Sequence, residues 1–225
     1  MCNLYAMTSD QITIGEIAGA VRDATGNLPA MPGVFPDYAA PVVRTGADGV
    51  RELVKARWGM PSPAFALEGR KVDKGITNVR NTASAHWRRW LGPVSRCVVP
   101  FTSFSESHRN ADGIVEPVWF ALNENRPLAF FAGIWTGWTS TRKVAEGEIT
   151  ADLFAFLTTA PNAEVGAVHP KAMPAILTTP DEVETWMTAP WSEAGRLQRP
   201  LTDGTLTVVA RGKRHDASAD ALASA

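Results

Sequence analysis

The apolar residues of this 225-residue sequence are divided into short runs, and the longest covers only residues 128–135. A helix needs about 20 apolar residues to cross a bilayer, so no membrane-spanning helix is expected. Glycine and proline, with 18 and 16 residues respectively, interrupt the chain between these runs. Short apolar runs bounded by such residues are typical of β-strands. The pattern therefore predicts a globular fold that is rich in sheet.

Turn residues and apolar periodicity together predict the order of elements. A helix is expected to begin at residues 9–11 and to end at residues 26–27, and residues 28–41, which hold four prolines, are expected to form a stiff loop. A turn at residues 123–127 should join its two flanking strands as a hairpin. Strands are predicted at residues 41–45, 50–60, 96–101, 117–122, 128–135, 153–158, 175–177 and 205–210, and further helices at residues 83–91 and 180–188.

Many short strands with scattered helices predict an α+β fold, in which a mixed, mainly antiparallel sheet forms an open barrel-like core with flanking helices. The composition, 45% hydrophobic and 20% charged, suffices for a sizeable core. Since we find no internal repeat and no linker, one domain is expected over residues 1–210. Residues 211–225, rich in alanine, serine and aspartate, are expected to form a disordered, frayed tail.

The charges nearly balance, with 22 basic and 23 acidic residues and a pI near 6.4. Proteins that bind nucleic acid usually carry a basic face or a high pI, so such a partner would have to be bound by a local patch. Two cysteines make no disulfide framework, and residues 1–5 do not resemble a secretory signal. An intracellular, reducing location is therefore expected.

Missing motifs disfavour several chemistries. The sequence has no glycine-rich phosphate loop, no strand-linked GxSxG and no HExxH. Its four histidines and two cysteines show no metal-ligand spacing. We therefore expect no metal, no nucleotide and no other cofactor.

The two cysteines differ in context. Cys97 lies in the apolar run of residues 96–100 and is expected to be a buried structural residue. Cys2 becomes N-terminal if Met1 is removed, and it then carries an α-amine of pKa about 7.7–8.0 beside a thiol of pKa about 8.5. This 1,2-aminothiol can condense with an aldehyde to an imine and then close to a thiazolidine. The closure is intramolecular, with an effective molarity of up to about 10⁵ M or more.

Five motifs that include this cysteine occur in an order found in one protein family. They are Met-Cys-Asn-Leu-Tyr at residues 1–5, Arg-Trp-Gly-Met-Pro at 57–61, Asn-Val-Arg at 78–80 followed by Arg88, Arg-Cys-Val-Val-Pro at 96–100 followed by Phe-Ser-Glu at 104–106, and His169 followed by Met-Pro-Ala-Ile-Leu at 173–177. Each motif alone is weak, but five in register are specific. The chain resembles the SRAP family, the SOS-response-associated or abasic-site-processing proteins, from residue 2 to about residue 188.

The resemblance implies a function on damaged DNA. Members of the family bind single-stranded DNA at an abasic site and form a thiazolidine between the N-terminal cysteine and the sugar aldehyde, which shields the lesion at stalled replication forks. Removal of Met1 gives the family its description as a peptidase, and a lyase activity belongs to the same expectation. The implied fold is mixed α/β around an antiparallel, barrel-like sheet. We expect a cytoplasmic monomer that joins the nucleoid at DNA damage.

Four matched residues receive catalytic roles from the resemblance. Cys2 is the nucleophile, and Asn78 matches a residue that orients the cysteine and substrate by hydrogen bonds. Glu106 matches the general acid that opens the sugar hemiacetal, a task for which an apolar setting would raise its pKa. His169 matches a histidine that shuttles protons during imine formation and ring closure.

The resemblance also assigns DNA contacts. Arg80 and Arg88 match arginines that pair with phosphates flanking the lesion. Pro36 and Phe65 lie where the family presents apolar wedges to exposed bases. The sequence departs from the family at Ser107, where a wedging tryptophan is frequent.

Two other functions stay open. In an N-terminal-nucleophile amidohydrolase, Cys2 would attack an amide and its own amine would serve as the base. Release of ammonia from glutamine would favour that function. In a non-catalytic DNA-binding module the cysteine would be incidental. The Cys2→Ala variant would then bind abasic DNA as well as the unmodified protein does, and neither would give a denaturation-resistant adduct.

Overall fold

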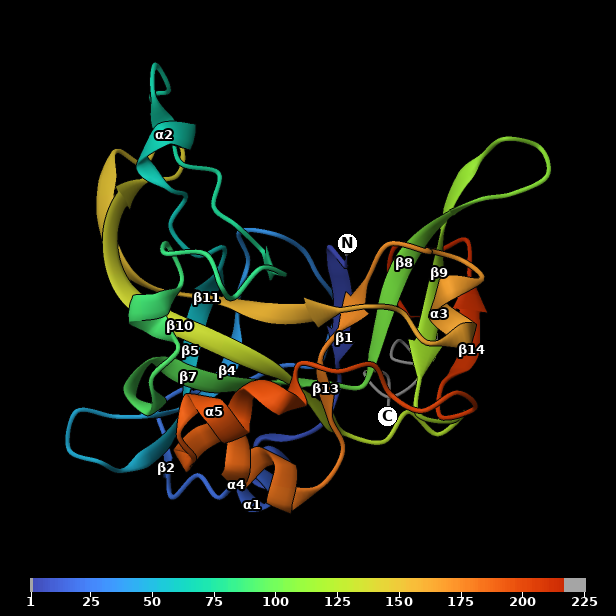
Figure 1. Cartoon of the computed structure of the whole chain (residues 1–225), viewed down its shortest axis with the longest axis horizontal. Coiled ribbons are helices and arrows are strands. Elements are labelled where there is room, and N and C mark those ends of the chain that lie inside the picture. Colours follow the sequence, from blue (N-terminus) through green and yellow to red (C-terminus); the bar gives the residue numbers. More distant parts are fainter. Residues whose placement is uncertain (1, 217–225) are drawn as a thin grey trace.

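The computed structural model describes residues 2–216, which form two sheets with helices around them (Figure 1). Five strands of the larger sheet make a ring in the order β11 (Glu148–Thr159), β10 (Ala129–Thr141), β7 (Arg96–Phe101), β4 (Ala39–Thr45) and β5 (Arg51–Trp58). Neighbours pair in antiparallel fashion until β5, which returns to β11 in parallel and closes the ring. The α+β class with a mixed, mainly antiparallel barrel-like core is confirmed, and the ring is closed where an open one was expected.

Short strands extend the ring at its margins. β2 (Arg22–Asp23) pairs with β5, and β13 (Ile176–Leu177) pairs with β10. β6 (Asn78–Val79) and β12 (Met173–Pro174) both pair with β11. The C-terminal half of β11 therefore holds two short strands that are distant in sequence. β6 lies about eighty residues before it in the chain, and β12 lies about fifteen residues after it.

A second sheet of five strands stands against the ring. Its order is β14 (Thr207–Arg211), β9 (Val115–Ala121), β8 (Ser103–Arg109), β1 (Leu4–Met7) and β3 (Met31–Val34). Tyr5 of β1 enters the aromatic core of the barrel, with its ring edge-on to Trp58 at 5.2 Å between centroids and to Phe131 at 5.7 Å. The opposite face of the sheet is covered by a smaller core of Leu4, Ala6 and Trp119.

The helices lie outside the sheets. α1 (Gln11–Ala18), α4 (Pro180–Thr188) and α5 (Trp191–Ala194) gather at the lower left of Figure 1. Trp186 fastens α4 to the ring, because its Nε1 donates to Cys97 O at 2.9 Å and to Gly133 O at 3.1 Å. The remaining helical elements are α2 (Ala64–Leu67), α3 (Ala163–Gly166) and the 3₁₀ turns η1 (Arg88–Trp90), η2 (Pro93–Ser95) and η3 (Gly195–Leu197). None of the described helices has both the length and the apolarity needed to span a membrane.

Several predicted elements agree with the structure. The strand at residues 96–101 and the helix at residues 180–188 have the predicted bounds. Other predicted strands are present but differ in length, and the strands predicted at residues 128–135 and 153–158 continue into a long β10–β11 hairpin. Cys97 is fully buried in β7, as predicted.

The first predicted helix is too long. α1 ends at Ala18 because Gly19 takes a left-handed φ of 67° and its N–H returns to Glu16 O. Beyond it, Val21 N donates to Arg51 O, so the chain has already joined the sheet. The stiff loop predicted for residues 28–41 is also wrong in part, since it contains β3 and the start of β4. β3 tolerates Pro32 because it is an edge strand, paired only with β1.

Two further expectations are corrected. Residues 83–91 form successive three-residue turns, with Trp87 N bonded to Ser84 O and Trp90 N to Trp87 O, and only η1 is helical. The expected hairpin across residues 123–127 does not form, because β9 pairs with β8 and β14 whereas β10 belongs to the ring. The connecting turn carries the chain between the two sheets, and Arg126 adopts a left-handed φ of 51° there.

The C-terminal segment differs from its expectation as far as it is described. Arg211 is the last residue of β14, one position beyond the expected domain boundary. Asp216 is 1% exposed and accepts hydrogen bonds from Ser103 Oγ at 2.6 Å and Arg126 Nε at 2.7 Å. Residues 211–215 are exposed, but the segment is attached to the sheet by hydrogen bonds from Gly212 N to Pro117 O and from Asp216 N to Pro32 O. The rest of the expected tail, residues 217–225, lies outside the described residues.

Replacement of Trp186 tests how α4 is held on the ring. Trp186→Phe keeps an aromatic ring but removes the indole N–H that serves two strand carbonyls. We expect the free energy of unfolding in urea to fall by about 1–3 kcal/mol. Trp191→Phe is the matched control, because Trp191 packs edge-on against Trp186 but is only half-buried. Equal losses in the two variants would contradict this role.

Candidate functional site

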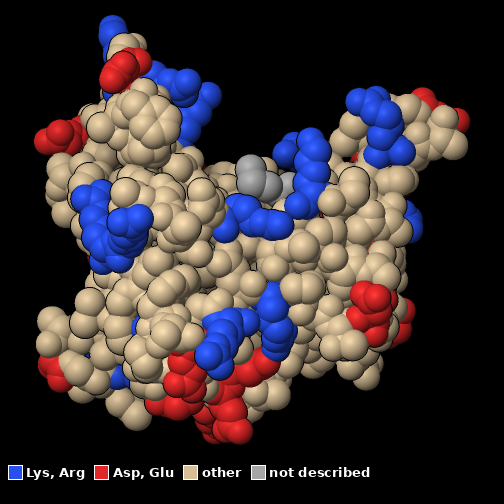
Figure 2. Space-filling model, in the orientation of Figure 1, with Lys and Arg blue, Asp and Glu red and all other residues tan. Residues whose placement is uncertain are grey.

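The start of β1 lies between two projections of the fold (Figure 1). We call residues 60–76, which carry α2, the α2 arm, and residues 107–117, at the ends of β8 and β9, the hairpin arm. A bridge between Met60 and Ile76 closes the base of the α2 arm. Figure 2 shows a hollow between the arms with Lys and Arg side chains along its rim, whereas the largest acidic group lies at the opposite end of this face. A local basic surface therefore exists despite the balanced charge.

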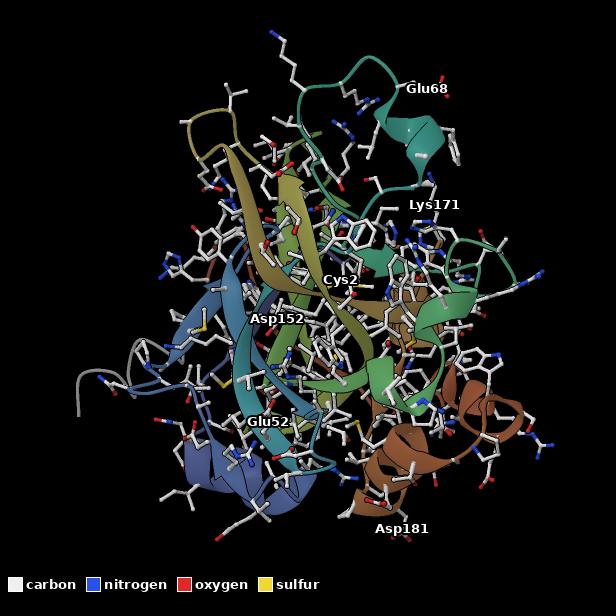
Figure 3. The ribbon with its side chains drawn as sticks, turned by 90° about the vertical axis from the view of Figure 1, so that its left-hand side faces the viewer. Cys2, Glu52, Glu68, Asp152, Lys171 and Asp181 are labelled. Carbon is white, nitrogen blue, oxygen red and sulfur yellow. The ribbon has the colours of Figure 1, made fainter. Side chains whose placement is uncertain are left out.

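Cys2 lies in the interior of the fold, and Figure 3 shows it in the middle of the molecule with Glu68 far above it on the α2 arm. Its side chain is fully buried, and Sγ donates to Leu4 O at 3.4 Å. Burial raises the pKa of the thiol, and the nearby Glu106 carboxylate raises it further. The thiol is therefore protonated at neutral pH.

Asn78 of β6 holds the backbone of Cys2. Its Nδ2 donates to Cys2 O at 2.8 Å, and it is also within 3.3 Å of Asn3 Oδ1. Asn3 Oδ1 also accepts from Thr77 Oγ1 at 2.9 Å. Asn78 Oδ1 is buried and has no hydrogen-bond partner among the described residues, so this acceptor is available to a further donor. Asn78 itself is buried in β6.

Glu106 of β8 is brought to the same place by strand pairing. β8 pairs with β1 so that Leu4 faces Ser105, which sets Glu106 beside the residues that precede β1. The residue is 2% exposed, and burial raises the pKa of its carboxyl from 4.5 to about 7. This group can therefore hold or release a proton near neutral pH.

His169 faces Glu106 from the loop after α3. Its Nε2 lies 4.0 Å from Glu106 Oε2. The loop is fixed because His169 N donates to Val165 O at 2.7 Å and Asn162 caps α3 through Val165 N. Burial lowers the pKa of the imidazole, which favours its neutral form, a proton acceptor, at neutral pH.

The structure thus brings together all four residues that were predicted to be catalytic. A buried cysteine, an amide bonded to its carbonyl, a carboxyl that titrates near neutral pH and an imidazole of lowered pKa converge from four separate segments. Such a set can carry out proton transfers around a carbonyl or an amide. Within residues 2–216, no three His, Cys, Asp or Glu side chains are grouped so as to hold a metal ion.

The predicted DNA-contact residues surround this centre less closely. Arg80 and Arg88 are both exposed, and Arg80 comes directly after β6, two residues beyond Asn78. Phe65 is 76% exposed in α2, at the projecting end of its arm. Pro36 is exposed beside Asp37, which is fixed by two 2.6 Å bonds from Arg57.

Sequence reasoning missed a residue that positions one of these arginines. Gln198 donates from Nε2 to Arg80 O and to Thr158 O, both at 2.9 Å, and its Oε1 accepts from Thr82 Oγ1 at 3.0 Å. It therefore ties the segment of Arg80 to β11. Gln198 lies 118 positions from Arg80, and nothing in its local sequence indicates this contact.

The raised pKa of Glu106 predicts a pH-dependent stability. Since the folded protein binds this proton more tightly than the unfolded chain, the contribution of Glu106 is full below about pH 4.5 and declines as pH rises through about 7. Glu106→Gln cannot titrate there. We expect the unfolding free energy of the unmodified protein, measured in urea from pH 4.5 to 8, to fall relative to that of Glu106→Gln as pH rises. A constant difference would show that the pKa is not raised.

Solved structures are similar to this fold. A protein from Bacteroides thetaiotaomicron matches with a TM-score of 0.71 and 21% identity over 92% of this chain and 90% of that one. A protein from Bordetella bronchiseptica matches with a TM-score of 0.66 and 24% identity over 94% of this chain and 98% of that one. A phage-related protein from the same organism matches with a TM-score of 0.68 and 20% identity over 92% of each chain. At these identities the likeness shows the fold alone. No curated protein matches the sequence.

The sequence also matches a family description across most of its length. The model for the SOS response associated peptidase family, SRAP, aligns with residues 1–211. That span contains both sheets, both arms and all four residues of the converging site. The chain therefore belongs to the SRAP family.

Proposed function

We propose that this protein recognises abasic sites in single-stranded DNA and captures them covalently through Cys2 after Met1 is removed. The family supports a role in processing DNA in the SOS response to damage. The observation that carries the finer proposal is the convergence of Cys2, Asn78, Glu106 and His169. An aminothiol, a proton donor, a proton acceptor and an orienting amide are what a sugar aldehyde requires for conversion to a stable ring.

The first step is opening of the sugar. An abasic deoxyribose is mostly a closed hemiacetal, and it becomes an aldehyde when its ring oxygen gains a proton and its C1 hydroxyl loses one. Glu106, with a carboxyl pKa of about 7, is suited to donate the first proton. Neutral His169, 4.0 Å from that carboxyl, is suited to accept the second.

The second step joins protein and DNA. The free α-amine of Cys2 adds to C1 and water leaves, which forms an imine. The thiol then adds to the same carbon, its proton passes to the imine nitrogen, and the five-membered thiazolidine closes with no further atom lost. Because Sγ is held by Leu4 O, the thiol has to turn away from that carbonyl to reach C1. Asn78 keeps the Cys2 carbonyl fixed, and its Oδ1 is placed to accept a hydrogen bond from the amine.

DNA binding follows from the surface around the site. Exposed Arg80 and Arg88 would neutralise phosphates on either side of the lesion, and the basic rim of the hollow would attract the strand (Figure 2). Pro36 and Phe65 would contact bases. A strand bound in this way would hold the lesion out of reach of other enzymes. We propose that the protein acts as a monomer on damaged DNA in the cytoplasm and at the nucleoid.

The free amine is the decisive requirement. A protein with an uncleavable N-terminal extension keeps the Cys2 thiol but has no α-amine at that residue. When this extended protein is incubated with an oligonucleotide that contains one abasic site, we expect no adduct on a denaturing gel. The processed protein should give an adduct whose intact mass equals protein plus oligonucleotide less one water.

Variants separate this function from its alternatives. Processed Cys2→Ser retains the amine but cannot close the thiazolidine, so its adduct should survive denaturation only after borohydride reduction. Full cross-linking by the extended protein would refute the mechanism. Ammonia release from glutamine together with the absence of an adduct would instead support the amidohydrolase.

Phosphate contacts predict a change in salt dependence. Binding of abasic single-stranded DNA should weaken with salt, and the slope of log binding constant against log salt concentration counts the ions released. Arg80→Gln and Arg88→Gln should each reduce the magnitude of that slope by about one. Arg22→Gln is the control, since Arg22 already pairs with Asp48 and Glu52. Unchanged slopes for both test variants would remove these arginines from the DNA path.

A further inference from the structure

A cavity of about 410 Å³ lies at the base of the hairpin arm, next to the converging site. Asn3 lines the cavity and also reaches the site, because its Oδ1 is within hydrogen-bonding distance of Thr77 Oγ1 and Asn78 Nδ2. Ser105 and Ser107, on either side of Glu106, line the cavity as well. A single DNA strand whose abasic sugar lies at Cys2 therefore has this cavity beside it.

The walls of the cavity suit a flat ring with polar edges. Phe35, Val115 and Pro117 supply apolar surface. The guanidinium of Arg214 lies 5.2 Å from the centroid of the Phe35 ring, so the two groups already form a cation–π pair at one wall. Ser107 is exposed and short, which leaves the space beside it open. The volume is at the low end of the range for small-ligand sites, about 300–1,000 Å³.

The polar groups indicate a base rather than a phosphate. The Glu116 carboxylate lines the cavity and would repel an anion, but it can accept a hydrogen bond from an amino group. Arg214 and the side chains of Asn3 and Ser107 can donate to ring nitrogens or carbonyls. An unstacked nucleobase combines an aromatic face for Phe35 with donors and acceptors along its edge.

We propose that this cavity, which we call the base pocket, receives the nucleobase of a nucleotide adjacent to the abasic site. The base stacks on Phe35, and its exocyclic amino group donates to Glu116. Adenine, cytosine and guanine are then favoured over thymine, which has no such group. This inference rests on the proposed function, because it takes the abasic sugar to be bound at Cys2.

The test uses single-stranded oligonucleotides with a stable abasic analogue at the centre, so that binding is measured without cross-linking. The nucleotide on each side carries adenine, thymine or no base. For the unmodified protein, loss of the base on one side should weaken binding between about fivefold and a hundredfold, as expected for loss of one stacked base. Adenine on that side should bind more tightly than thymine.

Three variants assign the effect to the pocket. Phe35→Leu removes the stacking face and should reduce the dependence on that base to less than twofold, whereas Phe35→Tyr should retain it. Ser107→Leu fills part of the cavity at an exposed position, so it should weaken the dependence without disturbing the fold. Indifference of the unmodified protein to the bases on both sides would overturn the proposal. So would full base dependence in both Phe35→Leu and Ser107→Leu.

Cross-linking to a true abasic site at saturating protein is measured separately. If adducts form but no neighbouring base affects binding, the base pocket is wrong and the proposed function stands. If base dependence is lost in Phe35→Leu while no adduct forms with any protein, the pocket stands and the covalent function fails.

Discussion

The contact between Tyr5 and Trp58 connects the candidate site to the barrel. Tyr5 lies three residues after Cys2, and its ring is packed edge-on against Trp58 in the interior of the ring of strands. Trp58 in turn donates from Nε1 to Thr77 O at 3.0 Å, immediately before Asn78. One aromatic pair therefore fixes both the strand that follows the cysteine and the strand that holds its carbonyl. β1 is also paired on both sides, with β3 and β8, whereas the two-residue β6 pairs, among the described strands, only with β11 and depends more on this contact.

The barrel also determines the electrostatics of the site. Glu106 is buried and His169 is partly buried, and burial disfavours the charged form of each. Burial moves their pKa values in opposite directions, up for the carboxyl and down for the imidazole, so that both groups are mainly neutral close to the same pH. A pair of this kind exchanges protons with a substrate without first removing a strong ion pair. The pairing of β8 with β1 and the capped α3 hold the two groups in this arrangement.

The sequence predicted the fold class and most strands because each strand follows from its own local pattern. It did not predict that β5 closes onto β11 or that β9 and β10 part into different sheets, since both depend on contacts between distant segments. In place of the helix predicted at residues 83–91 the chain forms three-residue turns, in which Trp87 and Trp90 are buried and Trp90 packs edge-on against the distant Trp138. Cys2 was identified by the chemistry of an N-terminal aminothiol, whereas Asn78, Glu106 and His169 were identified by motif resemblance alone. Isolated inspection of Glu106 shows only a serine-rich segment, and its burial arises from pairing with β1.

The buried thiol bears on the order of the proposed reaction. Because burial and Glu106 both raise the pKa of Cys2, a thiolate cannot be the first group to attack. The α-amine, with an ordinary pKa about one unit above neutral, supplies a neutral nucleophile far more readily. Once it has formed a protonated imine, the new positive charge on the nitrogen lies three bonds from Sγ and would stabilise the developing thiolate. In the proposed reaction the substrate itself would then activate the sulfur, and a free Cys2 thiol would stay unreactive towards other electrophiles until an aldehyde has been bound.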